Sequence, residues 1–305
     1  MTDSRQVALP HGTQVVLRDA GQDSTGLTVQ RGATGRVVGY DGARYRVALP
    51  DGRELSCVRG QVSLRREWQR SVALGDAADD GPSLVRDRTC YSAVVGSRAF
   101  GLDVDGSDTD VRGVFVAPTA AFWSLVKPPA HVDGPGEQFS WEVERFCELA
   151  LKANPNLLEV LHSPQVLSCQ PLGHELLALR PAFLSQLAYQ TYSGYVLSQF
   201  GKLQADLRLR GEPRWKHVMH LLRLLLSARD LLATGRPQVD VGPHRDVLLA
   251  VRRGELPWED VDRWRLQLHR EVDEALARSP LPAAPDVEAV DDWLRSVRRR
   301  DLVQA

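Results

Sequence analysis

Four aspartates lie within eight residues between two apolar runs, and this segment constrains the fold more than any other. Asp103, Asp105, Asp108 and Asp110 follow the apolar residues 91–95 and precede the apolar residues 114–116. Short apolar runs of this kind are typical of buried strands. Carboxylates crowded beside a buried sheet raise one another's pKa unless a cation lies between them. The segment therefore predicts two neighbouring strands joined by a turn that holds a cation.

Asp108 and Asp110 form the pair with the most specific chemistry. On a strand through Thr109 their side chains project to the same face. Mg²⁺ prefers carboxylate oxygens and keeps waters that a phosphate can replace, and Mn²⁺ is the alternative metal. Two such metals need a third acid. Glu137 begins the next strand-like segment and is the first choice, whereas Glu142 starts the following helix and has the alternative role of complementing its dipole.

Gly96 and Ser97 supply a candidate phosphate site. They follow the apolar run 91–95 and open a short predicted helix over residues 97–102. Unpaired N–H groups at such a turn favour a phosphate, glycine allows close approach, and the Ser97 hydroxyl can donate a further hydrogen bond. Together with the carboxylates, this turn predicts a metal–nucleotide site.

Two other interpretations of the acidic segment stay open. A calcium loop of the EF-hand type requires glycine at its sixth position, but counting from Asp103 the glycine falls at the fourth. The second alternative is a solvated acidic turn without a ligand, and Asp103 and Asp105 are assigned to such a turn.

A basic stripe is predicted on a leucine-rich helix over residues 215–234. Lys216, His220 and Arg223 recur at spacings of four and three, which places them along one helix face. We expect them to bind the triphosphate or the acceptor end, because cations opposing phosphates are the usual chemistry. The alternative is a stripe that only faces solvent.

The pattern along the chain predicts an α+β fold in several parts. Residues 1–66 contain five short strand patterns, near 15–17, 35–39, 45–49, 55–58 and 62–64, separated by glycine turns, and predict a small SH3-like, KOW-like β-barrel. Residues 67–84 read as a linker. Residues 85–165 are the predicted catalytic domain, a small mixed sheet that carries the metal–nucleotide site, and residues 166–305 are a C-terminal helical bundle.

Composition excludes several classes of protein. The 305 residues carry a formal charge of -1, so nucleic-acid binding requires a local patch rather than the overall charge. The four cysteines are widely spaced, which argues against a zinc module or a disulfide framework and suits a reducing compartment. No apolar run is long enough to span a bilayer and no signal pattern opens the chain. We expect a soluble, cytoplasmic protein without a membrane partner.

The motifs resemble the DNA polymerase beta-like nucleotidyltransferase superfamily. The match reads Gly96-Ser97, then Ser107-Asp108-Thr109-Asp110, then Gly113, and the closer resemblance is to predicted nucleotidyltransferases found beside RNA ligases in RNA-repair gene clusters. It extends through residues 142–146, 154–159 and 215–223 and ends near residue 254. It implies transfer of a nucleoside monophosphate from an NTP, with Asp108, Asp110 and a third acid as metal ligands. The third acid is usually aspartate, and here it is Glu137.

Three functions stay open, which differ in the acceptor of the nucleotide or lack one. An RNA 3′ end is favoured by the resemblance and by the predicted barrel. A protein hydroxyl is the alternative within enzymes, as in nucleotidyltransferases that adenylylate a toxin partner. An inactive relative that binds nucleotide or RNA is the alternative outside enzymes. Replacing Asp108 and Asp110 by asparagine distinguishes an enzyme from a binding module. An enzyme would lose Mg²⁺-dependent pyrophosphate release, whereas a binding module would keep its ligand.

Overall fold

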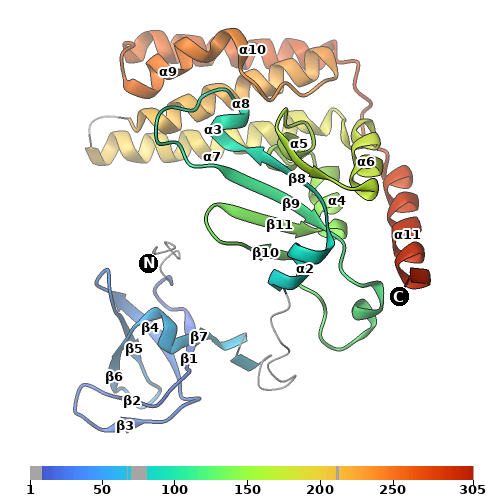
Figure 1. The fold of residues 1–305 in the computed structure, drawn as a ribbon. Helices are drawn as coiled ribbons and strands as arrows, with labels where there is room; N and C mark the ends of the chain where they lie inside the picture. Colours follow the sequence, from blue (N-terminus) through green and yellow to red (C-terminus); the bar gives the residue numbers. More distant parts are fainter. Residues whose placement is uncertain (1–8, 67, 70–80, 211–212, 305) are drawn as a thin grey trace. The chain divides into compact units, whose positions relative to one another are not determined.

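The computed structural model describes residues 9–66, 68–69, 81–210 and 213–304, and the side chains of 202–210 and 304 are outside the description. The chain divides into two compact units, Met1–Asp79 and Asp80–Ala305 (Figure 1). Each unit has its own hydrophobic core, and each is described separately below.

The first unit is an antiparallel sheet with the order β6-β5-β4-β1-β7. Its strands are β1 (Gln14–Leu17), β4 (Thr34–Tyr40), β5 (Tyr45–Ala48), β6 (Glu54–Cys57) and β7 (Val62–Leu64), and a separate pair is formed by β2 (Gly21–Gln22) and β3 (Thr28–Val29). All five predicted strands are present. Val15, Val37 and Val47 fill one side of the sheet, and in β5 the buried residues Tyr45 and Val47 flank the exposed Arg46, as a half-buried strand requires.

The predicted SH3-like barrel is not confirmed. β6 and β7 are the two edges of the sheet, and within the described residues no ladder joins them into a closed barrel. The 3-10 turn Arg59–Gln61 leads directly from one edge strand to the other. Alternation of apolar residues predicts strands but says nothing of closure, which depends on how far the sheet curls.

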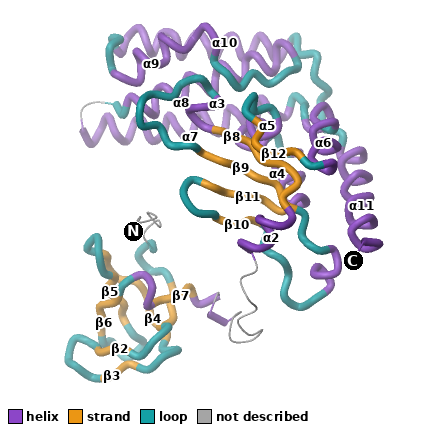
Figure 2. Tube along the Cα trace, in the orientation of Figure 1, coloured by secondary structure: helices purple, strands orange, loops and turns teal. Residues whose placement is uncertain are grey.

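The second unit contains a mixed sheet with the order β10-β11-β9-β8-β12 (Figure 2). Its strands are β8 (Thr89–Val95), β9 (Asp110–Phe115), β10 (His131–Asp133), β11 (Gln138–Glu142) and β12 (Val166–Cys169). β9 is antiparallel to β8 and parallel to β11. The apolar runs 91–95 and 114–116, predicted to be strands, fall in β8 and at the end of β9, and the strand-like segment that begins at Glu137 is β11.

Helices cover this sheet and continue beyond it. In chain order they are α2 (Gly81–Arg88), α3 (Gly96–Ala99), α4 (Val143–Leu151), α5 (Pro155–Leu161), α6 (Pro171–Ala178), α7 (Leu187–Arg210), α8 (Trp215–Thr234), α9 (Arg245–Arg253), α10 (Trp258–Ala277) and α11 (Val287–Gln304). Leu84 of α2 packs against Phe115 and Ala117 in a small cluster of its own. The main cluster joins β8 to α4, α5, α7 and α8.

Local capping explains where several helices begin and end. The Asn154 side chain accepts a hydrogen bond from the Asn156 N–H at 3.0 Å, and Pro155 takes the first helical position of α5. Gly235 and Gly254 end α8 and α9 in the left-handed conformation, with φ of 72° and 71°. The end of α8 agrees with the helix predicted over residues 215–234.

Some elements differ from the prediction. The region 166–305, predicted as a helical bundle, is not entirely helical, because β12 pairs with β8 and adds an edge strand to the sheet. β12 lies beyond the predicted domain boundary at residue 165. α2 begins at Gly81, inside the predicted linker, and most of the rest of that linker lies outside the described residues. β12 is short and half-exposed, so its residues lack the alternation that marks a strand.

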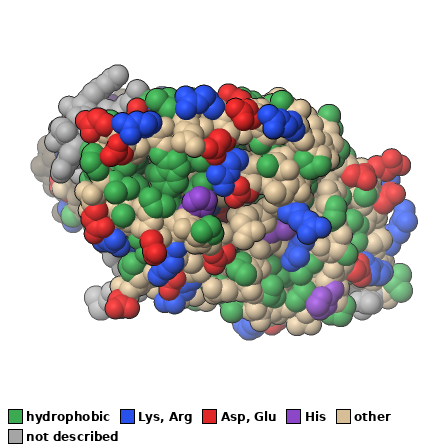
Figure 3. Space-filling view, turned by 90° about the horizontal axis from the view of Figure 1, so that it is seen from above, with side chains coloured by type: hydrophobic (Ala, Val, Ile, Leu, Met, Phe, Trp, Pro, Cys, Tyr) green, Lys and Arg blue, Asp and Glu red, His purple; other side chains and the backbone are tan. Residues whose placement is uncertain are grey.

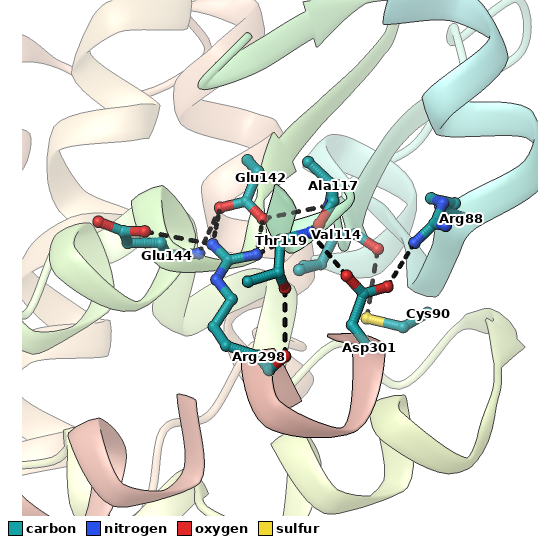
Figure 4. Close-up of polar contacts among 9 residues, drawn as sticks. All are labelled: Arg88, Cys90, Val114, Ala117, Thr119, Glu142, Glu144, Arg298 and Asp301. Carbon is teal, nitrogen blue, oxygen red and sulfur yellow. Dashed lines mark hydrogen bonds and ion pairs between the residues drawn. The ribbon is translucent and has the colours of Figure 1, made fainter. Parts of the chain in front are cut away.

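A cluster of ion pairs fastens α11 to the sheet (Figure 4). Arg298 donates to both oxygens of Glu142 at 2.9 and 3.1 Å and to Glu144 at 3.2 Å. Asp301 accepts from the Thr119 N–H at 2.6 Å and from Arg88 at 2.7 Å. We call these contacts of Arg298 and Asp301 the C-terminal clamp.

The helical side of the second unit has a mixed surface. Seen from above, acidic and basic side chains are interspersed across this face (Figure 3). Within the part of the chain that the structure describes, no helix is both long and apolar enough to traverse a bilayer.

Candidate active site

The turn between β8 and α3 lies against the first residue of β9. The register pairs Val95 with Asp110, so Gly96 follows directly beside that aspartate. Gly96 has a φ of 70°, and a Cβ on it would collide with Oδ2 of Asp110. Glycine is therefore required here for both its backbone conformation and its lack of a side chain. The carboxylate of Asp110 lies on the Gly-Ser turn.

Asp108 lies in the loop that enters β9. The strand begins at Asp110, so Asp108 is exposed two residues before it and not on the strand itself. Arg98 donates to the backbone carbonyls of Ser107 at 2.8 Å and Asp108 at 3.3 Å, which positions the loop. The Asp108 carboxylate makes no hydrogen bond or ion pair with any described residue, and so it is available to a ligand.

Arginines of α9 hold the other half of the acidic loop, a contact that the sequence does not reveal. Arg245 donates to the carbonyls of Gly101 at 2.7 Å and Asp103 at 3.3 Å, and Arg252 donates to Leu102 at 3.3 Å. Because these bonds go to backbone carbonyls, they order the loop and leave its carboxylates free.

Glu137 lies beside Asp110, where the parallel strands β9 and β11 begin. The parallel register pairs Gln138 with Val111, and one residue earlier it sets Glu137 next to Asp110. The Glu137 carbonyl accepts from the Val111 N–H at 3.0 Å and from Arg112 at 2.7 Å. Arg112 also lies 3.5 Å from Oδ1 of Asp110. Arg112 thus ties the start of β11 to the Asp110 carboxylate.

Glu142, the alternative third acid, has a structural role. Its carboxylate accepts from the N–H groups of Ala117 at 3.2 Å and Glu144 at 2.8 Å and pairs with Arg298. It caps the N-terminus of α4, and it is 2% exposed. A carboxylate with these partners has no oxygen directed to solvent, which leaves Glu137 as the candidate third acid.

A cavity of about 450 Å³ opens beside the turn. The sheet side contributes Val95, Gly96, Asp110, Arg112, Phe139 and Trp141, and the helices contribute Phe100, Asn156, Glu159, His220 and Arg223. The structure therefore brings together four predicted site residues, which are Gly96, Asp110, His220 and Arg223. Ser97, Asp108, Glu137 and Lys216 do not line this cavity.

Arg223 is buried and not on an exposed stripe. It is 6% exposed, and it donates to Oε1 of Glu159 at 2.6 Å. Its guanidinium lies 3.7 Å from the centre of the Phe100 ring. Nε of Arg223 has no hydrogen-bond partner among the described residues although it is buried. The carboxylate of Glu159 therefore neutralises most of the charge of Arg223, which was predicted to bind the triphosphate or the acceptor end.

His220 is held neutral in the cavity wall. Burial lowers the pKa of its imidazole, and together with the nearby positive charges of Arg223 and Lys216 it brings that pKa to about 4. A neutral imidazole has one donor and one acceptor nitrogen, which suits a hydroxyl group better than a phosphate.

We expect the free energy of unfolding to fall as the pH drops from about 6.5 towards 4. His220 and His162 both have pKa values lowered to about 4 by burial, so the unfolded chain binds more protons in this window. Each should cost about 2 kcal/mol by pH 5 and nothing above pH 7. Urea unfolding at several pH values measures this loss.

His220→Gln is the variant that isolates the contribution of His220. The variant should lack the loss of unfolding free energy that His220 causes, about 2 kcal/mol between pH 7 and 5. The loss caused by His162 should remain. An unchanged pH dependence in this variant would contradict a buried, neutral His220.

The carboxylates fit a divalent cation by donor type, because Mg²⁺ and Mn²⁺ prefer hard oxygen ligands. The space left by the missing Cβ of Gly96 keeps the Asp110 carboxylate against the turn. Across the residues that the structure describes, however, no three side chains of His, Cys, Asp or Glu lie close enough together to hold a metal. The three-acid site therefore stays a prediction, with Asp110 as its member in the cavity.

These features define a class of protein. A mixed sheet whose Gly-Ser turn meets an aspartate on the adjacent strand, with helices behind it, is consistent with a nucleotidyltransferase fold. Residues 67–296 match the model of RlaP, the RNA repair pathway DNA polymerase beta family, and the chain belongs to this family. It is a nucleotidyltransferase of RNA repair, which confirms the resemblance predicted from the sequence.

The chain also has a weak similarity to a protein of solved structure. A nucleotidyltransferase-like protein from Exiguobacterium sibiricum 255-15 is 15% identical, with a TM-score of 0.27, and the match covers 76% of this chain and 79% of that one. No curated protein matches the chain. Most of the first unit lies outside the family match, which begins at residue 67.

Proposed function

We propose that the protein transfers a nucleoside monophosphate from an NTP to the 3′ hydroxyl of RNA. The observation that carries the proposal is the Asp110 carboxylate seated on the Gly96 turn at the mouth of a cavity large enough for a nucleotide. Family membership supports nucleotidyl transfer, and RNA repair supports an RNA acceptor over a protein hydroxyl.

Asp108, Asp110 and Glu137 are the proposed holders of Mg²⁺ or Mn²⁺. A bound cation would neutralise charge on the phosphates and make the attacking hydroxyl more acidic. The position of Glu137 beside Asp110 supports its role as third ligand and as the base that takes the proton of that hydroxyl. Arg112, which bonds the Glu137 carbonyl, is the residue that positions this acid.

Gly96, Ser97, Lys216, His220 and Arg223 are the proposed nucleotide-binding residues. α3 has only four residues, so its dipole is weak, and the phosphate contacts fall to the Gly96 backbone and to the Ser97 hydroxyl. Ser97 Oγ has no hydrogen-bond partner among the described residues, and Lys216 is exposed near the start of α8. Neutral His220 and the Arg223 Nε are suited to the sugar or base of the nucleotide.

In the proposed reaction the RNA hydroxyl oxygen forms a bond to the α-phosphorus. The bond from that phosphorus to the bridging oxygen of the β-phosphate breaks, and pyrophosphate leaves in line. The proton of the hydroxyl passes to a carboxylate, Glu137 by its position. The cavity walls hold the nucleotide and exclude water, so that the hydroxyl and not a solvent molecule attacks.

Extension of a labelled RNA tests this proposal. The full-length protein is incubated with each α-labelled NTP, with Mg²⁺ or Mn²⁺, and with an RNA that has a free 3′ hydroxyl. We expect a longer RNA and equimolar pyrophosphate, and neither product with EDTA or with an RNA whose 3′ end is phosphorylated. Label in a protein from cell lysate but not in RNA would contradict the acceptor. Label in neither would contradict nucleotidyl transfer itself.

A further inference from the structure

The first unit is rich in arginine although the whole chain is almost neutral. Residues 9–66 contain nine arginines, no lysine and five acidic residues. Most of this unit lies outside the family match, so the family assigns it no role. The position of these arginines in the sheet shows where the charge gathers.

Strand register places the arginines on the side of the sheet away from the core. Gln14 of β1 pairs with Arg36 of β4, and the register of β1 with β7 sets Gln14 beside Arg65. Arg65 donates to the Gln14 side chain at 3.2 Å. Arg46 pairs with Ser56 across β5 and β6, between the buried residues of those strands. Exposed arginines therefore lie on β4, β5 and at the end of β7 on the same outward face.

Two more arginines reach this face through serine side chains. Arg18 donates to the hydroxyl of Ser63 at 2.6 Å, and Arg44 donates to the hydroxyl of Ser56 at 2.8 Å. Ser56 lies between the core residues Leu55 and Cys57, so it points outward. We name Arg18, Arg36, Arg44, Arg46 and Arg65 the arginine face.

Carboxylates neutralise little of this charge. Glu54 is 3.9 Å from Arg46, and both side chains are largely exposed. The other four guanidiniums bond to hydroxyl, amide or carbonyl oxygens of described residues, and none forms an ion pair with a described carboxylate. Asp23 and Asp51 are instead paired with Arg53. Most of the five N–H donors of each guanidinium therefore remain available to a ligand.

A groove lies beside two members of the arginine face, Arg36 and Arg65. It has a volume of about 340 Å³, and its lining includes Arg36 and Arg65 with Gln14, together with Val38, Leu49 and Pro50. Guanidinium forks match the oxygens of a phosphate, and an apolar floor accepts sugars or bases. Repeated phosphates along one strand fit several spaced arginines better than a single small anion does.

We propose that the arginine face binds the phosphodiester backbone of an RNA strand. The charge and the groove identify a polyanion, and the choice of RNA among polyanions rests on the proposed function. Contacts to phosphates carry no sequence information, so binding should be independent of sequence and strongly dependent on salt. The face would hold the RNA, while the second unit carries the chemistry.

Fluorescence anisotropy with the full-length protein tests the proposal. The probe is a labelled single-stranded RNA of about 16 nucleotides, measured in EDTA between about 50 and 200 mM salt. For Arg36→Gln/Arg65→Gln we expect affinity about tenfold lower and a slope of log K against log salt reduced by about 1.4, the value for two lost phosphate contacts. Arg263→Gln/Arg295→Gln removes the same charge from exposed helix positions and should bind like the wild type.

Several results would overturn the proposal. One is equal RNA affinity of the wild type and the Arg36→Gln/Arg65→Gln variant. A second is displacement of the RNA by polyglutamate at equal charge, which would indicate an acidic protein partner. If that variant fails to fold by circular dichroism, Arg44→Gln/Arg46→Gln is judged by the same affinity and slope. The Asp110→Asn protein should bind RNA with the affinity of the wild type. A failure of nucleotidyl transfer therefore does not contradict RNA binding by the arginine face. If the wild type transfers nucleotides to RNA and the arginine variants bind RNA as tightly as the wild type, the arginine-face proposal is rejected and the proposed function is not.

Discussion

Replacing Asp110 by asparagine is expected to lower the rate of nucleotidyl transfer by at least about 10³-fold. Asp110 is the carboxylate that lies on the Gly96 turn and lines the cavity. Asparagine keeps the shape of the side chain and removes the charge that would hold a divalent cation. The measurement is release of pyrophosphate and extension of labelled RNA under saturating NTP and Mg²⁺.

The control for this prediction comes from the same acidic loop. Asp105 is exposed and makes no contact with the cavity, so Asp105→Asn changes the charge of the loop by the same amount. It should leave the rate within about twofold, because surface substitutions away from a site have small effects. Activity of Asp110→Asn close to that of Asp105→Asn would contradict the proposed site.

A second measurement separates metal binding from turnover. Mn²⁺ together with a non-hydrolysable NTP should raise the Tm of the wild type, since a ligand that binds only the folded state stabilises it. The Asp110→Asn protein should fold and show no such rise. A rise equal to that of the wild type would place the cation elsewhere.

Replacing Arg298 by methionine is expected to cost about 3–5 kcal/mol in free energy of unfolding. The Glu142 side chain is 3% exposed and Arg298 is 15% exposed, so the variant would leave a buried carboxylate without its cation. Arg298 also stacks over Phe122, with 4.3 Å to the ring centre. For a unit of this size the loss corresponds to a fall of roughly 10 °C in Tm. Thermal unfolding followed by circular dichroism measures it.

The matched control lies on the same helix. Arg295 pairs with Asp291 on the surface, where both side chains are about half-exposed or more, so Arg295→Met should cost under about 1 kcal/mol. Adding Glu142→Gln to Arg298→Met removes the unpaired charge and should recover part of the loss. Equal effects of the two methionine variants would show that the C-terminal clamp adds no more than a surface pair.

Much of the fold could be predicted from local patterns. Short apolar runs mark β1 and β4, and alternation marks β5. Asn154-Pro155 marks where a helix begins, and Gly235 marks where one ends. These signals are local, since each depends on a few neighbouring residues and on backbone preferences. α2, β10 and β12 were missed because they are short and lack a clear period, and closure of a barrel was expected although the sheet of the first unit is open.

The candidate site could be predicted only in part. The proximity of Gly96 and Asp110 follows from the antiparallel pairing of β8 with β9, whereas the role of these residues in the site stays a prediction. Arg223 was assigned to phosphate from its place on α8, but it pairs with Glu159, which lies 64 residues away in sequence. Glu142 was an open alternative until its partner Arg298, 156 residues away, was located. Helix spacing shows which residues share a face but not which side chain lies opposite.

By itself the sequence indicated the class of chemistry, through its resemblance to nucleotidyltransferases and because the neighbouring strands β8 and β9 bring the Gly-Ser turn next to Asp110. It also determined the charge of the first unit, since that follows from composition. Only the tertiary structure decided which acids are free and which are used in packing. Burial and ion pairing between distant segments set the state of Glu142, Glu159 and Arg223, and such contacts form only when the whole chain has packed.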